Sequence, residues 1–233
     1  MGNTDIVGDI QRLIAFDLDG TLIDSRRDLT DSANQLIVEL GGAPLSEEAV
    51  GRMVGEGARL LVQRATMAAG LGDPPGALER FLAIYDRRLL VHTRMYDGVP
   101  QALEAASRVA HLSLLTNKPL APTVRILDAL GMHGVFASVI GGDSTFPRKP
   151  DPASLLEQIR LTGSSVERTL LVGDSAIDRE TARRAGVRCC LVRYGFGRVT
   201  LPDDVTAGDG WIVDHAGELP GVFAAFGTSG REP

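Results

Sequence analysis

Short apolar runs of strand length alternate with amphipathic segments through most of this chain. One run begins at residue 13 and predicts the first strand, and further runs predict strands at 111–115, 139–140, 169–172, 189–192 and 211–213. The segments between them have helical spacing and end at glycines, as at Gly131 and Gly186. Strands that alternate with helices favour a parallel sheet with helices on both faces, so we expect an α/β fold with a Rossmann-like core.

Residues 25–93 carry a different pattern, with helical periodicity and no strand-like run. Asp28 or Thr30 is suited to cap a helix that reaches about Leu40, and Ser46 is suited to cap the next one. We therefore expect an inserted all-α cap domain at 25–93. Residues 1–24 and 94–226 would form the core, and residues 227–233 a disordered tail.

Polar side chains follow three of the predicted strands at the points where those strands end. They are Asp17, Asp19, Thr116, Asn117 and Asp174. In an extended segment, positions 17 and 19 point to the same side. The carboxyl ends of parallel strands share one edge of a sheet, where ligands bind, so we expect these side chains to meet there, with the inserted helices as a lid.

These residue types suit a cation together with an anionic ligand. A few carboxylates, with few histidines or cysteines nearby, favour Mg²⁺, which also binds substrate phosphate. Thr116 and Asn117 offer a hydroxyl, an amide and backbone N–H groups to an anion, and Lys149 adds a positive charge. A carboxylate can attack phosphorus and form an aspartyl-phosphate, while a second one acts as acid and base.

Each motif taken alone also has a purely structural explanation. Asp-x-Asp-Gly occurs in ordinary turns and in calcium-binding loops. A calcium-binding loop needs further oxygen ligands in a pattern that residues 26–29 do not supply. Thr116-Asn117 is typical of a helix cap, Lys149 of a solvated loop, and Gly173-Asp174-Ser175 of a cap for the following helix. The ordered set, with each member at a strand end or a helix start, favours the functional interpretation.

The composition narrows the class of protein. A net charge of −6 over 233 residues argues against a nucleic-acid partner, and no apolar run reaches the ~20 residues that span a membrane. The first nine residues are polar and acidic, so we expect no secretory signal. Cys189 and Cys190 are adjacent and cannot form an ordinary disulfide, which fits a cytoplasmic protein.

Lysine is rare in this chain, because the basic residues other than Lys118 and Lys149 are arginines. A need for a compact, strongly hydrated point charge at these two positions is one explanation. Chance and codon bias are the other.

With these residues in place, the sequence resembles the haloacid dehalogenase-like hydrolase superfamily. The stretches that carry the resemblance are Asp17-Leu18-Asp19-Gly20-Thr21, Thr116-Asn117, Lys149-Pro150, and Gly173-Asp174-Ser175 with Asp178. The resemblance implies that Asp17 is the nucleophile and Asp19 the general acid and base. It implies Mg²⁺ held by the Asp17 side chain, the Asp19 main-chain carbonyl and Asp174.

The same resemblance assigns roles to the surrounding residues. Thr116 and Asn117 would contact the phosphate, and Lys149 would stabilise both the nucleophile and the phosphoryl group. Asp178, Thr21 and Ser175 would support the metal site from behind.

The position of the insert looks like the helical cap of the phosphoglycolate phosphatase-like subgroup, with Val54-Gly55-Glu56-Gly57 and Thr116-Asn117-Lys118-Pro119 among the supporting stretches. This implies a small phosphorylated metabolite as partner, most simply 2-phosphoglycolate. Gly55, Gly57 and Arg59 would face the substrate, with Arg59 pairing its carboxylate. An exposed helix arginine is the alternative for Arg59.

Other activities of the superfamily stay open at this point: pyrophosphatase, sugar-phosphate phosphatase and phosphomutase. A dehalogenase would not need Asp19 as acid and base, and a phosphonatase needs a cap lysine that residues 22–115 lack. A non-catalytic binder of phosphate ligands is the alternative from another class. The sequence leaves monomer and homodimer open.

Overall fold

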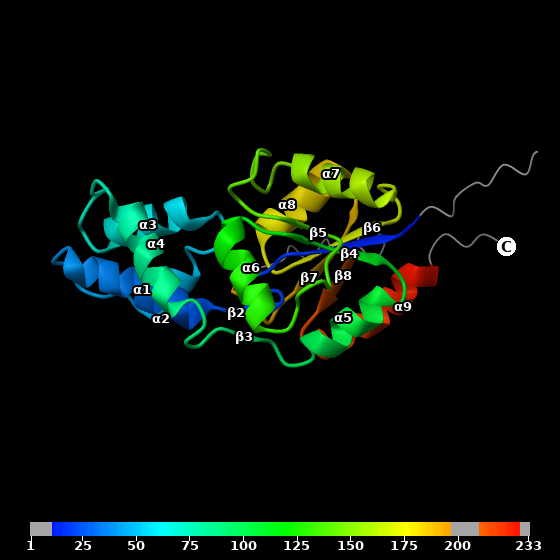
Figure 1. Ribbon diagram of the computed structural model, residues 1–233, viewed down its shortest axis with the longest axis horizontal. Helices are drawn as coiled ribbons and strands as arrows, with labels where there is room; N and C mark the ends of the chain where they lie inside the picture. The colour runs from blue at the N-terminus through cyan, green and yellow to red at the C-terminus, as the bar shows by residue number, and fades with distance from the viewer. Residues whose placement is uncertain (1–10, 197–209, 229–233) are drawn as a thin grey trace, which may run out of the picture.

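A six-stranded parallel sheet lies at the centre of the computed structural model, which describes residues 11–196 and 210–228. The strand order is β5-β4-β1-β6-β7-β8, which places β1 inside the sheet (Figure 1). The strands are β1 Leu13–Phe16, β4 His111–Leu115, β5 Ser138–Ile140, β6 Thr169–Gly173, β7 Arg188–Val192 and β8 Gly210–Val213. The expected Rossmann-like α/β core is confirmed, and every predicted strand is present.

Side chains of β1 pack against helices on both sides of the sheet, because successive residues of a strand point to opposite faces. Leu13 and Ala15 share an apolar cluster with residues of two helices, α7 Ala153–Thr162 and α8 Ala176–Ala185. Ile14 and Phe16 share a larger cluster with residues of three helices, α5 Val99–Ser107, α6 Leu120–Ala129 and α9 Leu219–Thr228. Figure 1 shows α7 and α8 on one side of the sheet and α5 and α9 on the other. The burial of all β1 residues fixes the place of the residues that follow it.

The C-terminal part of the chain differs from the expectation. After β8 a 3-10 turn at Ala216–Glu218 leads into α9, which was not predicted. This helix includes Gly227 and Thr228, so the expectation of a disordered tail is wrong for these two residues. Its apolar side chains have helical spacing, but Pro220-Gly221 in its first turn obscured that signal. Residues 1–10, 197–209 and 229–233 lie outside the described residues.

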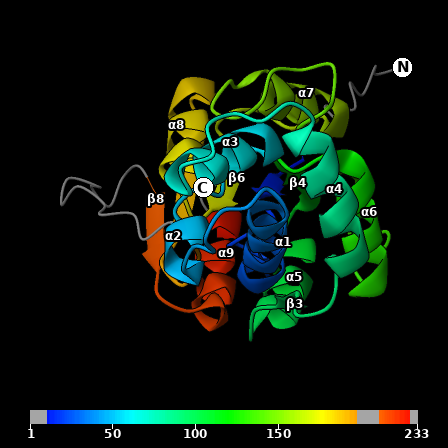
Figure 2. The same cartoon turned by 90° about the vertical axis from the view of Figure 1, so that its left-hand side faces the viewer.

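Helices without any strand occupy residues 25–93, as expected; they are α1 Arg26–Glu39, α2 Glu47–Gly51, α3 Ala58–Ala68 and α4 Ala77–Arg88. Ser46 caps α2 by accepting a hydrogen bond from the Ala49 N–H, as predicted. The predicted end of α1 near Leu40 is confirmed, but its predicted cap is wrong, because Ser25 occupies the cap position and Asp28 and Thr30 are buried inside the helix. We call residues 25–93 the cap and the remaining described residues the core. Figure 2 views the molecule from the cap side and shows α4 beside α6 of the core.

Two short strands that the sequence did not predict join the cap to the core. β2 Ile23–Asp24 pairs antiparallel with β3 Arg94–Met95. Strands of two residues are too short to give a periodic signal. The chain enters the cap through β2 and leaves it through β3, so both connections run side by side (Figure 1).

The buried carboxylate of Asp28 ties the two ends of the cap together. Its Oδ2 accepts hydrogen bonds from the His92 N–H at 2.9 Å, the Thr93 N–H at 2.8 Å and the Thr93 hydroxyl at 2.8 Å. Asp28 is fully buried. Water therefore cannot take the place of its carboxylate as the acceptor for these donors. The start of the cap is therefore held against its end by charge-assisted hydrogen bonds.

We predict that Asp28→Ala lowers the free energy of unfolding by about 3 kcal/mol, because it leaves buried donors without an acceptor. Urea denaturation measures this change. Asp31→Ala is the matched control on the same helix, since Asp31 makes a partly exposed ion pair with Arg88 at 2.7 Å and its loss should cost less than about 1 kcal/mol. Equal losses in the two variants would contradict this assignment.

Candidate active site

The chain turns back on itself directly after β1 instead of continuing the strand. The backbone N–H groups of Thr21 and Leu22 donate to the carbonyl of Leu18 at 3.2 and 2.9 Å. Positions 17 and 19 therefore do not lie on one extended strand, which corrects the geometry expected from the sequence. Even so, Asp17 and Asp19 line the same cleft between core and cap.

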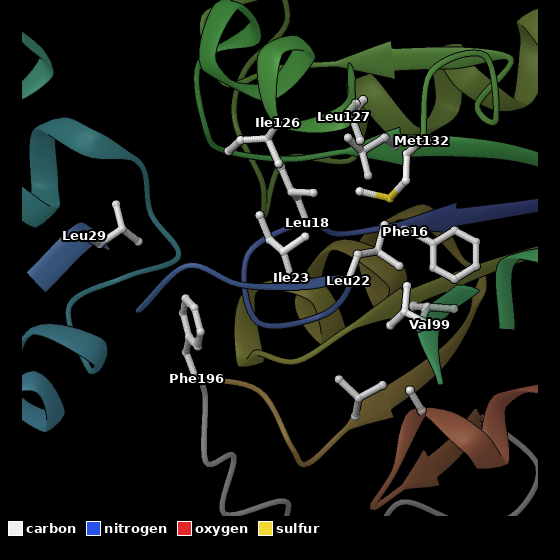
Figure 3. Close-up of a cluster of buried hydrophobic side chains, with 14 of the residues drawn as sticks. Phe16, Leu18, Leu22, Ile23, Leu29, Val99, Ile126, Leu127, Met132 and Phe196 are labelled. Atoms are coloured by element: carbon white, nitrogen blue, oxygen red, sulfur yellow. The ribbon is translucent and has the colours of Figure 1, made fainter. Parts of the chain in front are cut away.

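Apolar side chains hold this turn in place. Leu18 and Ile23 are fully buried and pack beside Ile126 of α6 (Figure 3). Gly20 adopts a φ of +90°, and a Cβ there would lie 2.2 Å from Oδ2 of Asp174. The turn that presents the two aspartates therefore requires glycine at this position.

Lys149 lies between two carboxylates at the centre of the site. Its Nζ donates to Oδ1 of Asp17 and to Oδ1 of Asp178, each at 2.6 Å. Burial alone would lower the pKa of Lys149, but the two carboxylates raise it above its usual value. Burial raises the pKa of Asp17 to about 7 in the metal-free protein, with Lys149 opposing the rise and Asp178 adding to it. The expected contact between Lys149 and Asp17 is thus present.

Asn117 holds the backbone of Lys149. Its Oδ1 accepts from the Lys149 N–H at 2.9 Å, and its Nδ2 donates to the Lys149 carbonyl at 3.0 Å and to the Gly55 carbonyl of the cap at 2.9 Å. The side-chain amide is therefore engaged in positioning Lys149. This corrects the expectation that the amide faces a phosphate, and it leaves the backbone at Asn117 as the proposed phosphate contact.

Three carboxylates gather where a metal ion is expected. One oxygen each of Asp17, Asp174 and Asp178 lies within 4.8 Å of the others, and all three residues are buried. Asp178 is already engaged, because it bonds Lys149 and accepts from the Ser175 hydroxyl at 2.5 Å and the Ser175 N–H at 3.1 Å. Both carboxylate oxygens of Asp178 are therefore engaged. The roles of Asp17 and Asp174 as metal ligands, with Asp178 and Ser175 behind them, stay a prediction.

Asp174 is held by a loop that the sequence analysis did not connect with it. The Phe196 N–H donates to Oδ2 of Asp174 at 2.7 Å. Arg26, the first residue of α1, donates to the Gly195 carbonyl at 3.1 Å and its guanidinium lies 4.8 Å from the Phe196 ring centroid. A cap residue thereby supports the loop behind the expected metal ligand.

Asp19 has partners that the sequence analysis missed. Lys118 Nζ lies 3.1 and 3.0 Å from the two carboxylate oxygens, and the Ser25 hydroxyl donates to Oδ1 at 2.5 Å. Lys118 also donates to the hydroxyl of Tyr85 on α4 at 2.7 Å. Two signals in the sequence included Lys118, the scarcity of lysine and the stretch Thr116-Asn117-Lys118-Pro119, but neither indicated Asp19 as its partner. Both lysines of the chain lie in this site.

The pocket above Asp17 has a polar floor from the core and an apolar wall from the cap. Thr116 lies in the floor and is nearly fully buried. Gly55 and Gly57 line the pocket, and the prediction that they face the substrate stays a prediction. The wall also includes Leu29, Val54, Ala58, Leu61, Phe81, Leu82 and Tyr85.

Arg59 and Thr21 do not take the places expected for them. Arg59 is exposed and lines a separate hollow beside Asp73. Because Ala58 and Leu61 face the pocket, the helical turn directs the residue after Ala58 away from it, so the substrate-facing prediction for Arg59 is wrong. The hydroxyl of Thr21 is buried without a hydrogen-bond partner among the described residues, and its support of the metal site stays a prediction.

Comparisons with known proteins identify the family of this chain. A sequence profile of the haloacid dehalogenase-like hydrolase family matches residues 14–192. The chain is 43% identical over 196 residues to a phosphoglycolate phosphatase of Rhodospirillum rubrum, covering 80% of this chain and 81% of that one. It is 38% identical over 221 residues to a phosphoglycolate phosphatase of Pseudomonas putida, covering 92% and 80%.

A solved structure gives the same result for the fold. It is described as a predicted phosphoglycolate phosphatase from Haemophilus somnus and superposes with a TM-score of 0.81 at 29% identity, covering 92% of this chain and 99% of that one. The family match spans all the strand-end residues described above. The chain belongs to the haloacid dehalogenase-like hydrolase family.

Proposed function

We propose that this protein is a Mg²⁺-dependent phosphatase that hydrolyses 2-phosphoglycolate through an aspartyl-phosphate on Asp17. The observation that carries the proposal is the buried contact of Lys149 with Asp17 at 2.6 Å, beside two further carboxylates. The names of the similar proteins of Rhodospirillum rubrum and Pseudomonas putida support the substrate.

Asp17 is the residue suited to attack phosphorus. It follows a fully buried strand, lines the pocket and is held by Lys149. The ammonium group offsets the repulsion between the attacking carboxylate and an incoming phosphate, which is about 4 kcal/mol for two unit charges at 4 Å and an effective dielectric constant of 20. Thr116 and the backbone at Asn117 lie in the same pocket and would receive the phosphate oxygens.

Asp19 is the residue suited to move protons. It lines the same pocket as Asp17, and its carboxylate is partly exposed toward it. There it can protonate the departing alkoxide of the substrate and then take a proton from the water that attacks the aspartyl-phosphate. One proton is thereby given and one recovered per turnover.

The residues present fit a magnesium ion. Asp17 and Asp174 offer hard oxygen ligands, and the three clustered carboxylates with Lys149 leave an excess of negative charge. Mg²⁺ prefers such a site, with one or two carboxylates and a substrate phosphate. The Asp19 main-chain carbonyl is the proposed third protein ligand. When bound, the ion would neutralise charge on the phosphoryl group.

The pocket supports a small substrate. Its cap wall is apolar, and Lys118 is the cation among the described residues that line it. Pyrophosphatase, sugar-phosphate phosphatase and phosphomutase activities share the same core chemistry, so the substrate assignment rests on the similar proteins. No helix among the described residues is long and apolar enough to cross a bilayer. We also propose a cytoplasmic location, since Cys189 and Cys190 are both free thiols.

We predict that Asp17→Asn abolishes hydrolysis of 2-phosphoglycolate, because an amide cannot form the aspartyl-phosphate. The residual rate should be below about 10⁻³ of wild type. Phosphate release measures activity, and circular dichroism checks that the variant is folded. Arg59→Ala is the control on the cap, and its kcat/KM should stay within about twofold of wild type.

We predict that EDTA removes the activity of the wild-type protein on para-nitrophenyl phosphate and that added Mg²⁺ restores it. The assay follows nitrophenolate absorbance.

Retained activity in Asp17→Asn would exclude the nucleophile assignment. Binding of 2-phosphoglycolate without turnover in the wild type would instead favour the non-catalytic binder.

We predict that the metal-free protein binds Mg²⁺ more tightly as the pH rises from 6 to 8. With its pKa at about 7, Asp17 carries a proton below that pH and must lose it to bind a cation. The affinity at pH 6 should therefore be about tenfold weaker than on the plateau above about pH 8. Isothermal titration calorimetry in two buffers of different ionisation enthalpy measures both the affinity and the released proton. An affinity that does not change over this range would contradict the prediction.

A further inference from the structure

Lys118 joins the cap to Asp19. Its Nζ contacts both carboxylate oxygens of Asp19 and donates to the hydroxyl of Tyr85 at 2.7 Å. Lys118 follows β4 in the core, whereas Tyr85 belongs to α4 of the cap. Through this contact, the side chain of Tyr85 in the cap reaches Lys118, and Lys118 in turn contacts Asp19, the proposed acid and base.

Both partners of the bridge are rigidly placed. The Lys118 side chain is 5% exposed, and its backbone N–H and carbonyl bond Thr116 Oγ1 and the Gly142 N–H. The Tyr85 ring stacks on Phe81, with centroids 5.8 Å apart and 10° between the planes. A side chain held at both ends restricts the carboxylate it binds, because a buried ammonium requires its acceptors.

We propose that Lys118 is a positioning residue for Asp19, and that Tyr85 fixes Lys118 only when the cap lies over the core. The proton transfers of Asp19 then depend on the cap being in place. This inference rests on the proposed function, since it assigns a helper to the proposed acid and base. A competing role for Lys118 is direct contact with the substrate carboxylate, and the experiment separates the two.

The experiment compares Tyr85→Phe, which removes only the hydroxyl and keeps the stacked ring, with Lys118→Met and Lys118→Arg. Steady-state kcat and KM are measured with 2-phosphoglycolate and with ethyl phosphate, which has no carboxylate. Thermal unfolding of each protein checks the fold. Arg125→Met is the matched control, because Arg125 of α6 pairs with Asp86 of α4, which also joins the core to the cap, and this pair does not include Asp19.

We expect Lys118→Met to lower kcat about 10- to 100-fold for both substrates, with KM changed less than about threefold, because positioning acts on proton transfer rather than on binding. Tyr85→Phe should lower kcat about three- to tenfold through the loss of one hydrogen bond. Lys118→Arg should recover part of the Lys118→Met loss, and Arg125→Met should stay within about twofold of wild type.

A burst measurement with para-nitrophenyl phosphate adds a readout that a structural role would not produce. Its leaving group needs little protonation, so Lys118→Met should keep a near-stoichiometric burst of nitrophenolate while the following turnover slows. Loss of the burst together with turnover would overturn the inference, because the variant would then have lost the phosphoryl-accepting site as a whole.

Three further outcomes would overturn the inference. An increase in KM confined to 2-phosphoglycolate would make Lys118 a substrate contact. Equal kcat losses in Arg125→Met and Tyr85→Phe would show that the loss comes from weaker contact between cap and core in general, and not from Lys118. Unchanged kcat in Tyr85→Phe would show that the contact of Tyr85 with Lys118 does not matter for turnover, and this variant decides the matter if Lys118→Met does not fold. A wild-type protein inactive on all three substrates would instead refute the proposed function.

Discussion

The contact of one buried ammonium group, Lys149 Nζ, with the carboxylates of Asp17 and Asp178 is the constraint on which the site depends. Three carboxylates within 4.8 Å of one another repel strongly in a buried setting, and Lys149 offsets that repulsion. The protein places this charge from a loop 132 residues away from Asp17 along the chain. Asn117 holds that loop by hydrogen bonds to both backbone groups of Lys149. The residue expected to hold phosphate thus acts first by holding the lysine.

The cap contributes to the site at several levels, although none of its residues belongs to the predicted catalytic set. Its backbone meets Asn117 at Gly55, Arg26 supports the loop that bonds Asp174, and Tyr85 meets Lys118. Strand β2, through which the chain enters the cap, follows the turn that carries Asp19, and Ser25, just after that strand, bonds Asp19. The proposed nucleophile, Asp17, is therefore supported mainly by the core, whereas the proposed acid and base, Asp19, is held by residues on both sides of the cleft.

The sequence predicts those features that short-range patterns encode. Strand ends are local, so Asp17, Asp174 and Thr116 could be assigned to one edge of a parallel sheet. A sequence motif does not show which residues of a helix face the pocket. Ala58 and Arg59 are neighbours in the sequence, yet Ala58 lines the pocket and Arg59 does not. The pairing of Lys118 with Asp19 spans 99 residues, and a contact of that range depends on how the cap and core pack. α9 shows the same limit at the other end of the chain, where Pro220-Gly221 outweighed a helical apolar pattern.

The central claim is that Asp17 accepts the phosphoryl group, and trapping the covalent intermediate tests it most directly. The wild-type protein would be quenched in acid during turnover of 2-phosphoglycolate with Mg²⁺, reduced with borohydride and analysed by peptide mass spectrometry. An acyl phosphate on Asp17 is reduced to an alcohol, so the account predicts homoserine at position 17. Homoserine at position 19 or 174, or full turnover with an unmodified residue 17, would contradict it.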